Sequence, residues 1–437
     1  VAYAERSRIC RKRAVNVEGF QINEDGVLVK YSGNATDVVI PEGVTSIGDG
    51  AFEDSSNLTS VEIPETVTSI GENAFSDCSS LVSIKIPNGV TSIGSGAFGR
   101  CSSLVNISLP DGITSIERST FTGCSALTSI SIPRGVTSIE DRVFWDCSAL
   151  TSINISEEVS DIGGRMDEAL LFRGCNALLS ISVAEGNNHY SSYNGVLYNK
   201  DRSSLLRCPN ALTNISVSNE VTSIGRSAFS GCSALVSISL PNKVTSIGSL
   251  TFEDCSSLTS VSFPDGVTSI GDSVFRGCSS LTSINLPDGV TSIGSSTFKD
   301  CSSLTSIRLP NGVTKIGKWA FSGCSRLVNI NLPNGITNIG DSTFKDCSSL
   351  TSIILPNGVT KIGEWAFSGC SAMTNISFSE SLASIEDRAF SDCSALTSIS
   401  LPKGIRNIGE LFGGVFSGCS SLASINIPEG IGQIWDG

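Results

Sequence analysis

The sequence predicts a β-rich solenoid: a curved single domain of stacked 23-residue repeats, with parallel strands, short helical or 3-10 turns and an N-terminal hairpin cap. Two observations lead to this fold class. One template recurs from Ile40 onward, and 13 of its 16 full copies are 23 residues long. Nearly every copy also places a Phe and a Cys in the same register. Because one copy is too short to bury its own apolar side chains, neighbouring copies must stack to form a core.

The copy over residues 83–101 shows the elements of one repeat. Residues 83–86 alternate Ser or Lys with Ile, which is the pattern of a half-buried strand. Pro87 ends this strand because it has no N–H to donate to the next rung, and Asn88–Gly89 are typical turn residues. Residues 90–93 form a second short extended segment. The remainder, through residues 97–101, is long enough only for one helical or 3-10 turn.

The Phe positions indicate a continuous core. Stacked repeats would align them into one aromatic column at a spacing of about 4.8 Å per rung, whereas a cofactor-binding aromatic cluster would not recur at every rung. Fifteen of the 19 Phe share this register: residues 52, 75, 98, 121, 144, 172, 229, 252, 275, 298, 321, 344, 367, 390 and 416.

The Cys positions follow the same rule. There is no C-x-x-C pair, so the spacing does not indicate a metal site. We interpret these residues as a buried column of reduced thiols that hydrogen-bond to loop backbone, since Ser55 stands in the column in the first repeat. Disulfides between neighbouring rungs, or a redox function, are the alternatives. Fourteen of the 16 Cys belong to this column: residues 78, 101, 124, 147, 175, 232, 255, 278, 301, 324, 347, 370, 393 and 419.

Composition and charge exclude several classes of function. The 437 residues carry a formal net charge of −13, which argues against a nucleic-acid partner, because such proteins cluster Lys and Arg against phosphate. No run approaches the roughly 18 apolar residues of a membrane span, so we expect no direct membrane insertion. The single histidine, His189, leaves little room for histidine-based catalysis or a zinc site. We therefore expect a non-enzymatic protein with no catalytic residue, no metal and no cofactor.

Departures from the template divide the chain into five segments. Residues 1–16 are basic and read as a disordered lead-in, and residues 17–39 contain two short extended runs around a Gly turn, which suit a hairpin cap. Residues 40–182 form a first repeat array and residues 217–437 a second. Between them, residues 183–216 form an atypical repeat that carries its own hairpin.

Three of the irregular stretches are candidate contact sites. His189 and Tyr190 lie in the atypical repeat, where a solvated or locally bonded histidine is the simpler interpretation and a ligand contact the alternative. The other two stretches are insertions at equivalent repeat positions, residues 164–171 and 410–415. Insertions of this kind form loops on one side of a solenoid, either tolerated or used for binding.

The tryptophans offer candidate interaction anchors. Trp319 and Trp365 occupy the same template position two repeats apart, inside near-identical blocks, so a duplication explains the pair. Trp145 follows its column Phe by one residue and is expected to point outward. Exposed aromatic side chains on a polar surface are also typical anchors for a partner.

The outward positions of the longer strand predict a long, nearly neutral face. Most of these positions are Ser, with Asn106, Asn214, Asn329 and Asn375 interspersed, and Arg308 stands in a second, mixed column. Sixteen rungs would give a face of roughly 75 Å. A face of this length suits one large partner or several weak contacts that add through multivalency.

The repeat resembles a known family. Residues 278–294, with Phe298, look like the BspA-like, treponemal-type leucine-rich repeat, and the resemblance covers residues 40–437. It implies a leucine-rich-repeat solenoid and a place among bacterial or protist surface proteins proposed to mediate adhesion to host or neighbouring cells. It therefore implies an extracellular or cell-surface location and a protein or glycan partner.

Three functional hypotheses follow. The first is a cell-surface or secreted interaction protein that binds protein or glycan through the strand face or the insertion loops. The second is a rigid architectural scaffold subunit of a larger assembly. The third is a protein whose Ser and Thr ladders bind an ordered lattice, which the irregular second column at Lys85, Arg308 and Ile354 disfavours.

Overall fold

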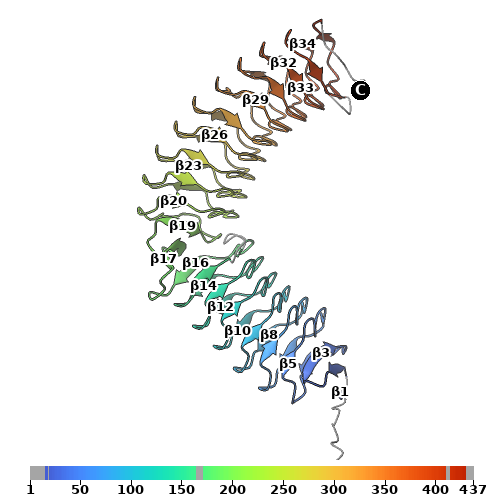
Figure 1. Ribbon diagram of the computed structural model, residues 1–437, viewed down its shortest axis with the longest axis vertical. Coiled ribbons are helices and arrows are strands. Elements are labelled where there is room, and N and C mark those ends of the chain that lie inside the picture. Colours follow the sequence, from blue (N-terminus) through green and yellow to red (C-terminus); the bar gives the residue numbers. More distant parts are fainter. Residues whose placement is uncertain (1–14, 18, 164–170, 410–413, 430–437) are drawn as a thin grey trace, which may run out of the picture. The chain divides into compact units, whose positions relative to one another are not determined.

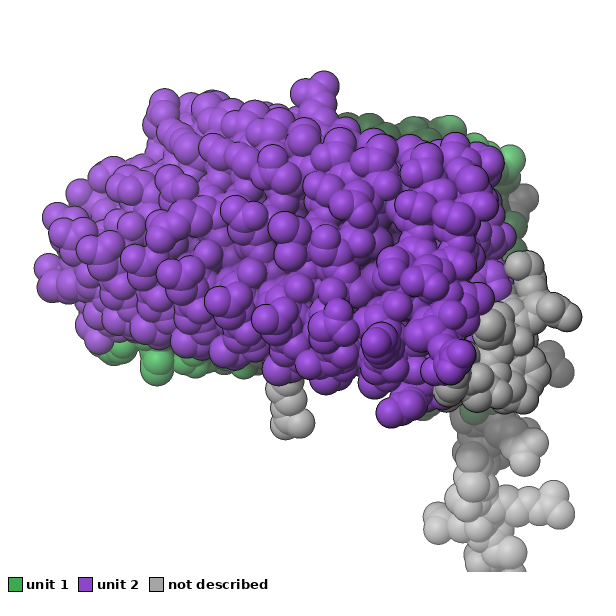
Figure 2. All heavy atoms as spheres, turned by 90° about the horizontal axis from the view of Figure 1, so that it is seen from above, with its two compact units in different colours: residues 1–190 green, residues 191–437 purple. Residues whose placement is uncertain are grey.

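The computed structural model describes residues 15–17, 19–163, 171–409 and 414–429, which form two compact units, unit 1 (residues 1–190) and unit 2 (residues 191–437) (Figure 2). Within each unit the chain winds into coils whose strands lie side by side in parallel (Figure 1). The predicted solenoid of 23-residue repeats is therefore confirmed. The division between the units falls inside the atypical repeat, residues 183–216.

Each coil contains a narrow strand of two residues, of which the second is a buried Ile. Ser69 pairs in parallel with Ser46 and with Ser92, so the pairing offset is one repeat. These strands are β5 (Ser46–Ile47), β7 (Ser69–Ile70), β9 (Ser92–Ile93), β11 (Ser115–Ile116), β13 (Ser138–Ile139) and β15 (Asp161–Ile162) in unit 1, and β20 (Ser223–Ile224), β22 (Ser246–Ile247), β24 (Ser269–Ile270), β26 (Ser292–Ile293), β28 (Lys315–Ile316), β29 (Asn338–Ile339), β31 (Lys361–Ile362), β33 (Ser384–Ile385) and β35 (Asn407–Ile408) in unit 2.

A second, broader strand provides the long exposed face. In β8, Ile84 points inward while Ser83 and Lys85 point outward, as the alternating pattern predicted. The broad strands are β4 (Asp37–Val39), β6 (Ser60–Glu62), β8 (Ser83–Lys85), β10 (Asn106–Ser108), β12 (Ser129–Ser131), β14 (Ser152–Ile155) and β16 (Ser180–Val183) in unit 1, and β21 (Ser237–Ser239), β23 (Ser260–Ser262), β25 (Ser283–Asn285), β27 (Ser306–Arg308), β30 (Ser352–Ile354), β32 (Asn375–Ser377), β34 (Ser398–Ser400) and β36 (Ser424–Asn426) in unit 2.

The prediction of a helical or 3-10 turn in each repeat is wrong, because the described residues contain no helix of either kind. The reason is that the segment holds two left-handed residues four positions apart, such as Asn73 (φ 54°) and Asp77 (φ 59°), which a right-handed helix does not accommodate. Residues between them form i→i+3 turns, while Phe75 donates its N–H to Ala97 of the next rung at 2.8 Å. The turn segment therefore also joins neighbouring rungs.

The predicted aromatic column forms the centre of each unit. The Phe rings from Phe52 to Phe390 are fully buried, Phe416 is partly buried, and the rings stack face to face, from 4.9 Å between the centroids of Phe52 and Phe75 to 6.0 Å between Phe121 and Phe144. The column continues in the same way in unit 2, ending with Phe390 and Phe416 at 5.7 Å. The interpretation of these residues as core is confirmed.

The cysteines form the predicted hydrogen-bonding column. Most of these thiols donate to the carbonyl of the Phe on the preceding rung, for example Cys101 to Phe75 and Cys324 to Phe298, both at 3.1 Å, whereas Cys232 at the start of unit 2 donates to the carbonyl of Pro209 at 3.7 Å. All the described cysteines are free thiols, and no disulfide joins any of them. Burial raises the pKa of Cys124 to about 12. The thiol column therefore supports the core rather than offering reactive groups.

A three-stranded antiparallel cap begins unit 1. Strand β1 (Val15–Val17) pairs with β2 (Phe20–Ile22), which pairs with β3 (Val27–Tyr31), and β3 then runs parallel to β5. The Tyr31 ring lies 5.1 Å from both Phe20 and Phe52, so it closes the first end of the Phe column. The cap starts at Val15 rather than at residue 17, because the Val-Asn-Val segment pairs as a strand. The rest of the expected lead-in, residues 1–14, lies outside the described residues.

Unit 2 begins with a cap of the same topology. The order is β17 (Tyr190–Tyr193), β18 (Val196–Asn199) and β19 (Ser204–Arg207), and β19 runs parallel to β20. Asn194 and Gly195 both have positive φ, as a tight hairpin turn requires. Cys208 donates its N–H to Ala228 at 2.7 Å, just as Tyr31 does to Ala51. The predicted hairpin of the atypical repeat is therefore the first layer of the second stack.

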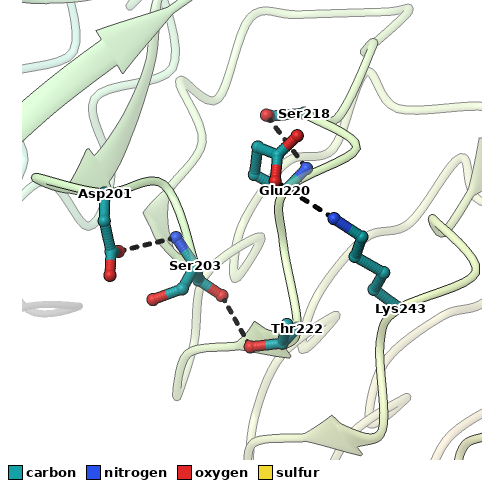
Figure 3. A network of polar contacts seen from close by, with 6 residues as sticks. All are labelled: Asp201, Ser203, Ser218, Glu220, Thr222 and Lys243. Carbon is teal, nitrogen blue, oxygen red and sulfur yellow. Dashed lines mark hydrogen bonds and ion pairs between the residues drawn. The ribbon is translucent and has the colours of Figure 1, made fainter.

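Polar contacts attach this cap to the rungs that follow (Figure 3). Thr222 Oγ1 donates to the Ser203 carbonyl at 3.2 Å, and Lys243 Nζ donates to Glu220 Oε2 on the preceding rung at 3.1 Å. Hydrogen bonds from Ser203, including its N–H at 2.9 Å, lower the pKa of the Asp201 carboxyl.

The described part of the chain has no helix long and apolar enough to span a bilayer.

Candidate functional site

The exposed face of the broad strands carries several of the predicted contact residues. Asn106 in β10 and Asn375 in β32 are exposed there. Arg308 in β27 is also exposed, and its Nη2 lies 3.5 Å from Asp288 Oδ1. Asn329 and Asn214 are exposed but lie outside the strands. In the rung of Asn329 an isolated bridge between Arg308 and Asn331 replaces the regular strand.

Aliphatic side chains are also exposed on this face: Ile354 stands in the second outward column predicted from the sequence, whereas the others were not predicted. Ile354 at the end of β30 is 74% exposed, whereas the equivalent positions of neighbouring rungs are polar. Other exposed aliphatic residues come directly before the broad strand or its equivalent segment: Val236 and Val328 in unit 2, and Val82, Val105 and Leu179 in unit 1. Each unit therefore presents scattered apolar contact points within a polar face.

The Ser and Thr hydroxyls that form regular columns on the surface donate hydrogen bonds to backbone carbonyls of neighbouring rungs. Thr128 Oγ1 donates to the Val105 carbonyl at 3.4 Å, and Thr151 Oγ1 donates to the Thr128 carbonyl at 3.2 Å. Ser125 Oγ likewise donates to Ser102 at 3.2 Å. These side chains join rungs to one another, so their regularity has a structural cause.

The turn segments form a second surface, the turn face, with three columns of residues. Two of these columns have left-handed backbone: one lies two residues before each column Phe, as Asn73 does, and the other two residues after it, as Asp77 does. The middle column, between them, is the residue that directly follows the Phe. Left-handed backbone is unfavourable for bulky side chains, yet Trp319 (φ 55°), Trp365 (φ 56°) and Arg142 (φ 58°) adopt it. Ser, Asn and Gly occupy the same column in other rungs, so the template imposes this conformation.

The three predicted tryptophan anchors all lie on the turn face, but their surroundings differ. Trp365 is half-buried because Arg388 and Lys345 lie over its ring, at 4.7 and 5.1 Å from the centroid. Trp145 is covered in the same way by Arg142 at 4.9 Å and Arg173 at 5.5 Å. Two of the three rings are therefore occupied by cations of the chain itself.

Trp319 is the most open of the three. It is 43% exposed, and within the described residues no cation lies over its ring. The difference from Trp365 arises one rung further on, where Ser342 takes the place of Arg388. The duplication thus produced one covered and one open tryptophan.

His189 and Tyr190 form no pocket with a second titratable group. His189 is exposed, and its ring centroid lies 6.5 Å from that of Tyr190. The backbone N–H groups of both residues donate to the buried Asn187 side chain at 2.8 Å. Asn187 therefore orders this turn, and the local structural interpretation accounts for His189.

The two predicted insertions, residues 164–171 and 410–415, lie almost wholly outside the described residues, which leave out 164–170 and 410–413.

A groove on the turn face of unit 1 was not predicted. Its volume is about 550 Å³, within the range of small-molecule sites. The middle column contributes Glu53, Ser76, Gly99, Thr122 and Trp145. One left-handed column contributes Asn73, Gly96, Ser119 and Arg142, and the other contributes Asp77, Arg100, Gly123 and Asp146.

In the groove three consecutive rungs have small residues in the middle column, Ser76, Gly99 and Thr122, which leaves space between the two left-handed columns. In unit 2 three consecutive rungs instead have Glu253, Arg276 and Lys299 there, and Arg276 Nη1 lies 3.2 Å from Glu253 Oε1. The sequence gives no unique signal for the groove, because Ser368, Ser391 and Ser417 form a similar run of small residues in the same column of unit 2.

Several charged side chains in and beside the groove form ion pairs. Among the described residues no group of three or more His, Cys, Asp or Glu side chains is placed to hold a metal ion. The acidic Asp141 is buried beside the groove, with Arg118 Nε at 3.4 Å and Arg142 Nε at 3.6 Å from its Oδ2. Asp141 therefore orients two guanidinium groups, and Asp77 in the groove lies 3.6 Å from Arg100 Nη1.

Comparison with known proteins gives a consistent result. The family model for the BspA type leucine rich repeat region, which spans six copies, matches residues 28–121, 68–200, 202–328 and 320–437. A leucine-rich repeat protein from Bacteroides ovatus is 29% identical over 94% of this chain and 91% of its own, with a TM-score of 0.52. The search of curated proteins found no match.

Two further solved structures are similar in sequence, with lower structural scores. A leucine rich cell surface protein from Faecalibacterium prausnitzii is 26% identical over 94% of both chains, with a TM-score of 0.42. The leucine rich repeat protein of T. pallidum is 30% identical over 42% of this chain and 86% of its own, with a TM-score of 0.34.

Proposed function

Because this chain belongs to the BspA-type leucine-rich repeat family, we propose that it is a non-enzymatic adhesion or interaction protein, located at a cell surface or outside the cell. Leucine-rich repeat proteins generally mediate protein interactions or surface functions, and their solenoid is typically a non-enzymatic scaffold. The proposed partner is a protein or glycan on a host or neighbouring cell, bound through the exposed faces of the solenoid.

The observation that carries this proposal is the exposed face of the broad strands. Ile354 is 74% exposed, with the Asn375 rung beside it and Arg308 two rungs before it, and an exposed aliphatic side chain within a polar surface is a contact point for a partner. The face has little net charge to attract ligands from a distance. Affinity from many weak contacts, increased by multivalency, is therefore expected.

The test is adhesion of the purified chain, fluorescently labelled, to cultured epithelial cells and to wells coated with extracellular-matrix proteins. The strand-face variant Arg308→Glu with Ile354→Lys should lose at least tenfold in binding. Asn357→Lys, an exposed turn substitution outside the strand face, is the matched control and should bind as the original chain does. Equal binding by all three proteins, or no binding by the original chain, contradicts the proposal.

A scaffold role makes a different prediction. A scaffold subunit would co-purify from its native source in a fixed stoichiometric complex, and its adhesion to cells would not depend on Arg308 or Ile354. Size-exclusion chromatography with light scattering distinguishes the two functions.

A further inference from the structure

The groove on the turn face of unit 1 has features that select one class of ligand. Its assignment rests on the proposed function, the binding of a protein or glycan partner, and narrows the class of that partner. We propose that this groove binds a linear, neutral oligosaccharide that runs along the stacking direction, with about one sugar ring for each rung and its end against Arg142. The lining residues come from five successive rungs. The Phe rings of these rungs are spaced by 4.9 to 6.0 Å, close to the length of one pyranose residue.

The backbone of the groove is not available to a ligand. The N–H of Arg100 donates to Thr122 at 2.6 Å, the N–H of Gly123 donates to Trp145 at 2.7 Å, and the N–H of Gly99 donates to Gly96 at 2.7 Å. A peptide strand that binds by adding to a sheet needs free backbone groups of this kind. A ligand in the groove therefore meets side chains.

The side chains of the groove lack the anchors that a protein partner needs. None of the described residues that line it is aliphatic, and the aromatic ring among them, Trp145, is already covered by Arg142 and Arg173. Protein interfaces depend on a few apolar or aromatic groups buried in pockets. The groove thus disfavours a peptide as its occupant.

Charge disfavours a polyanion. The lining holds Arg100 and Arg142 together with Glu53, Asp77 and Asp146, and Arg100 Nη1 lies 3.6 Å from Asp77 Oδ2. Residues 1–190 contain 24 acidic and 13 basic side chains, so a negatively charged polymer is repelled. A neutral ligand has no such penalty.

The same side chains suit a polyhydroxyl ligand. A sugar hydroxyl both donates and accepts hydrogen bonds, so neighbouring hydroxyls satisfy a carboxylate and a guanidinium together. Asp146, Asn73 and Arg100 offer planar groups along the walls, and Arg142 is held in place by Trp145 and Asp141. Preorganised side chains lose little entropy on binding.

The test is isothermal titration of the full chain with three neutral hexasaccharides, made of β-1,4-linked glucose, N-acetylglucosamine or xylose, and with hexagalacturonate as the anionic probe. At least one neutral hexasaccharide should bind, and more tightly than its disaccharide, because the groove spans several rungs. Thr122→Lys should weaken this binding at least tenfold by filling the groove. Lys299 occupies the same column in unit 2, so the template accepts lysine there.

Two further variants keep the result interpretable. Ser322→Lys makes the same change in the same column outside the groove and should bind normally. Asp146→Asn keeps the shape and the left-handed backbone (φ 58°), which Asn tolerates, but removes the charge that strengthens the hydrogen bonds it accepts, so binding should weaken severalfold.

The inference is overturned if no neutral hexasaccharide binds, if only hexagalacturonate binds, or if Thr122→Lys binds as well as Ser322→Lys. A chain that adheres to cells through its strand face but binds no neutral hexasaccharide would contradict this inference alone. Loss of adhesion in the strand-face variant with unchanged sugar binding would show that the two surfaces are independent and would support both statements.

Discussion

The carboxylate of Asp254 lies over Gly277 on the next rung, so that a Cβ on Gly277 would stand only 2.4 Å from Asp254 Oδ1. The same relationship joins Asp300 to Gly323 and Asp346 to Gly369, each at 2.4 Å. Asp and Gly therefore alternate in this left-handed column of unit 2. In this column the sequence pattern therefore has a period of two rungs, and the alternation keeps carboxylates of adjacent rungs from facing one another.

The first prediction concerns this pair. Gly277→Ala should lower the free energy of unfolding by about 1–2 kcal/mol, because the new Cβ meets Asp254 and the backbone φ is 73°. Urea unfolding followed by circular dichroism measures the change. Gly266→Ala, where the nearest atom to the new Cβ is 3.5 Å away, is the control and should be close to neutral. If the contact matters, Asp254→Ala should reduce the cost of Gly277→Ala, and strictly additive effects would contradict this explanation.

The second prediction concerns the thiol column. Cys324→Ala removes the donor to the Phe298 carbonyl at 3.1 Å and leaves that buried acceptor without its partner, which should cost about 1–3 kcal/mol. Cys324→Ser keeps a donor and should cost less. Both are measured by urea unfolding. A larger loss for Ser than for Ala would show that the thiols act only as apolar filling.

The third prediction is alkaline lability. Burial raises the pKa of Cys78 and of Cys124 to about 12, whereas an unfolded thiol ionises near 8.5. Well below pH 8.5 these thiols are protonated in both states, so they add no pH dependence to stability. Above pH 8.5 the unfolded state releases protons that the folded state retains, so stability falls as pH rises toward 12, by at most about 1.4 kcal/mol per pH unit for each thiol. Urea unfolding at pH 7, 9 and 10 measures the slope, and Cys324→Ala should reduce it. A flat profile would contradict the prediction.

The fourth prediction uses the duplicated tryptophans. Ser342→Arg should place a guanidinium over Trp319, as Arg388 does over Trp365, and the left-handed column already accepts Arg at φ 54°. A new cation–π contact adds about 0.5–1 kcal/mol at an exposed site. Acrylamide quenching of Trp319 fluorescence, measured with the other tryptophans replaced by Phe, should decrease. Arg388→Ser is the reciprocal variant and should increase quenching of Trp365; no change in either would be evidence against the stacking explanation.

The fifth prediction concerns the cap of unit 1. Tyr31→Ala removes the ring that closes the Phe column against Phe52 and should cost about 3 kcal/mol. Because each rung contacts only its neighbours, the loss should be local. Amide hydrogen exchange should accelerate in β5 and β7 but not in β13. Uniform acceleration through unit 1 would indicate global rather than local coupling. Tyr193→Ala, at a partly exposed ring, is the control.

Much of the fold follows from the sequence alone. A period of 23 residues with Phe, Cys and Ile in fixed register leaves stacking as the way to bury those side chains, so the solenoid, the Phe column, the thiol column and the hairpins were predictable. The absence of the short helix was not predictable. It depends on left-handed residues such as Asn73 and Asp77, whose conformation is imposed by hydrogen bonds to the next rung.

The candidate sites divide in the same way. The sequence by itself determined that Trp145, Trp319, Trp365, Asn106 and Arg308 lie on the surface, since each falls at an outward position of the template. Only the tertiary structure decided which of them a ligand can reach: Arg142 and Arg173 cover Trp145, while Ser342 leaves Trp319 open. The groove at Ser76, Gly99 and Thr122 also needed the structure. A hollow is made by side chains from different rungs, and residues 23 positions apart become neighbours only when the coils stack.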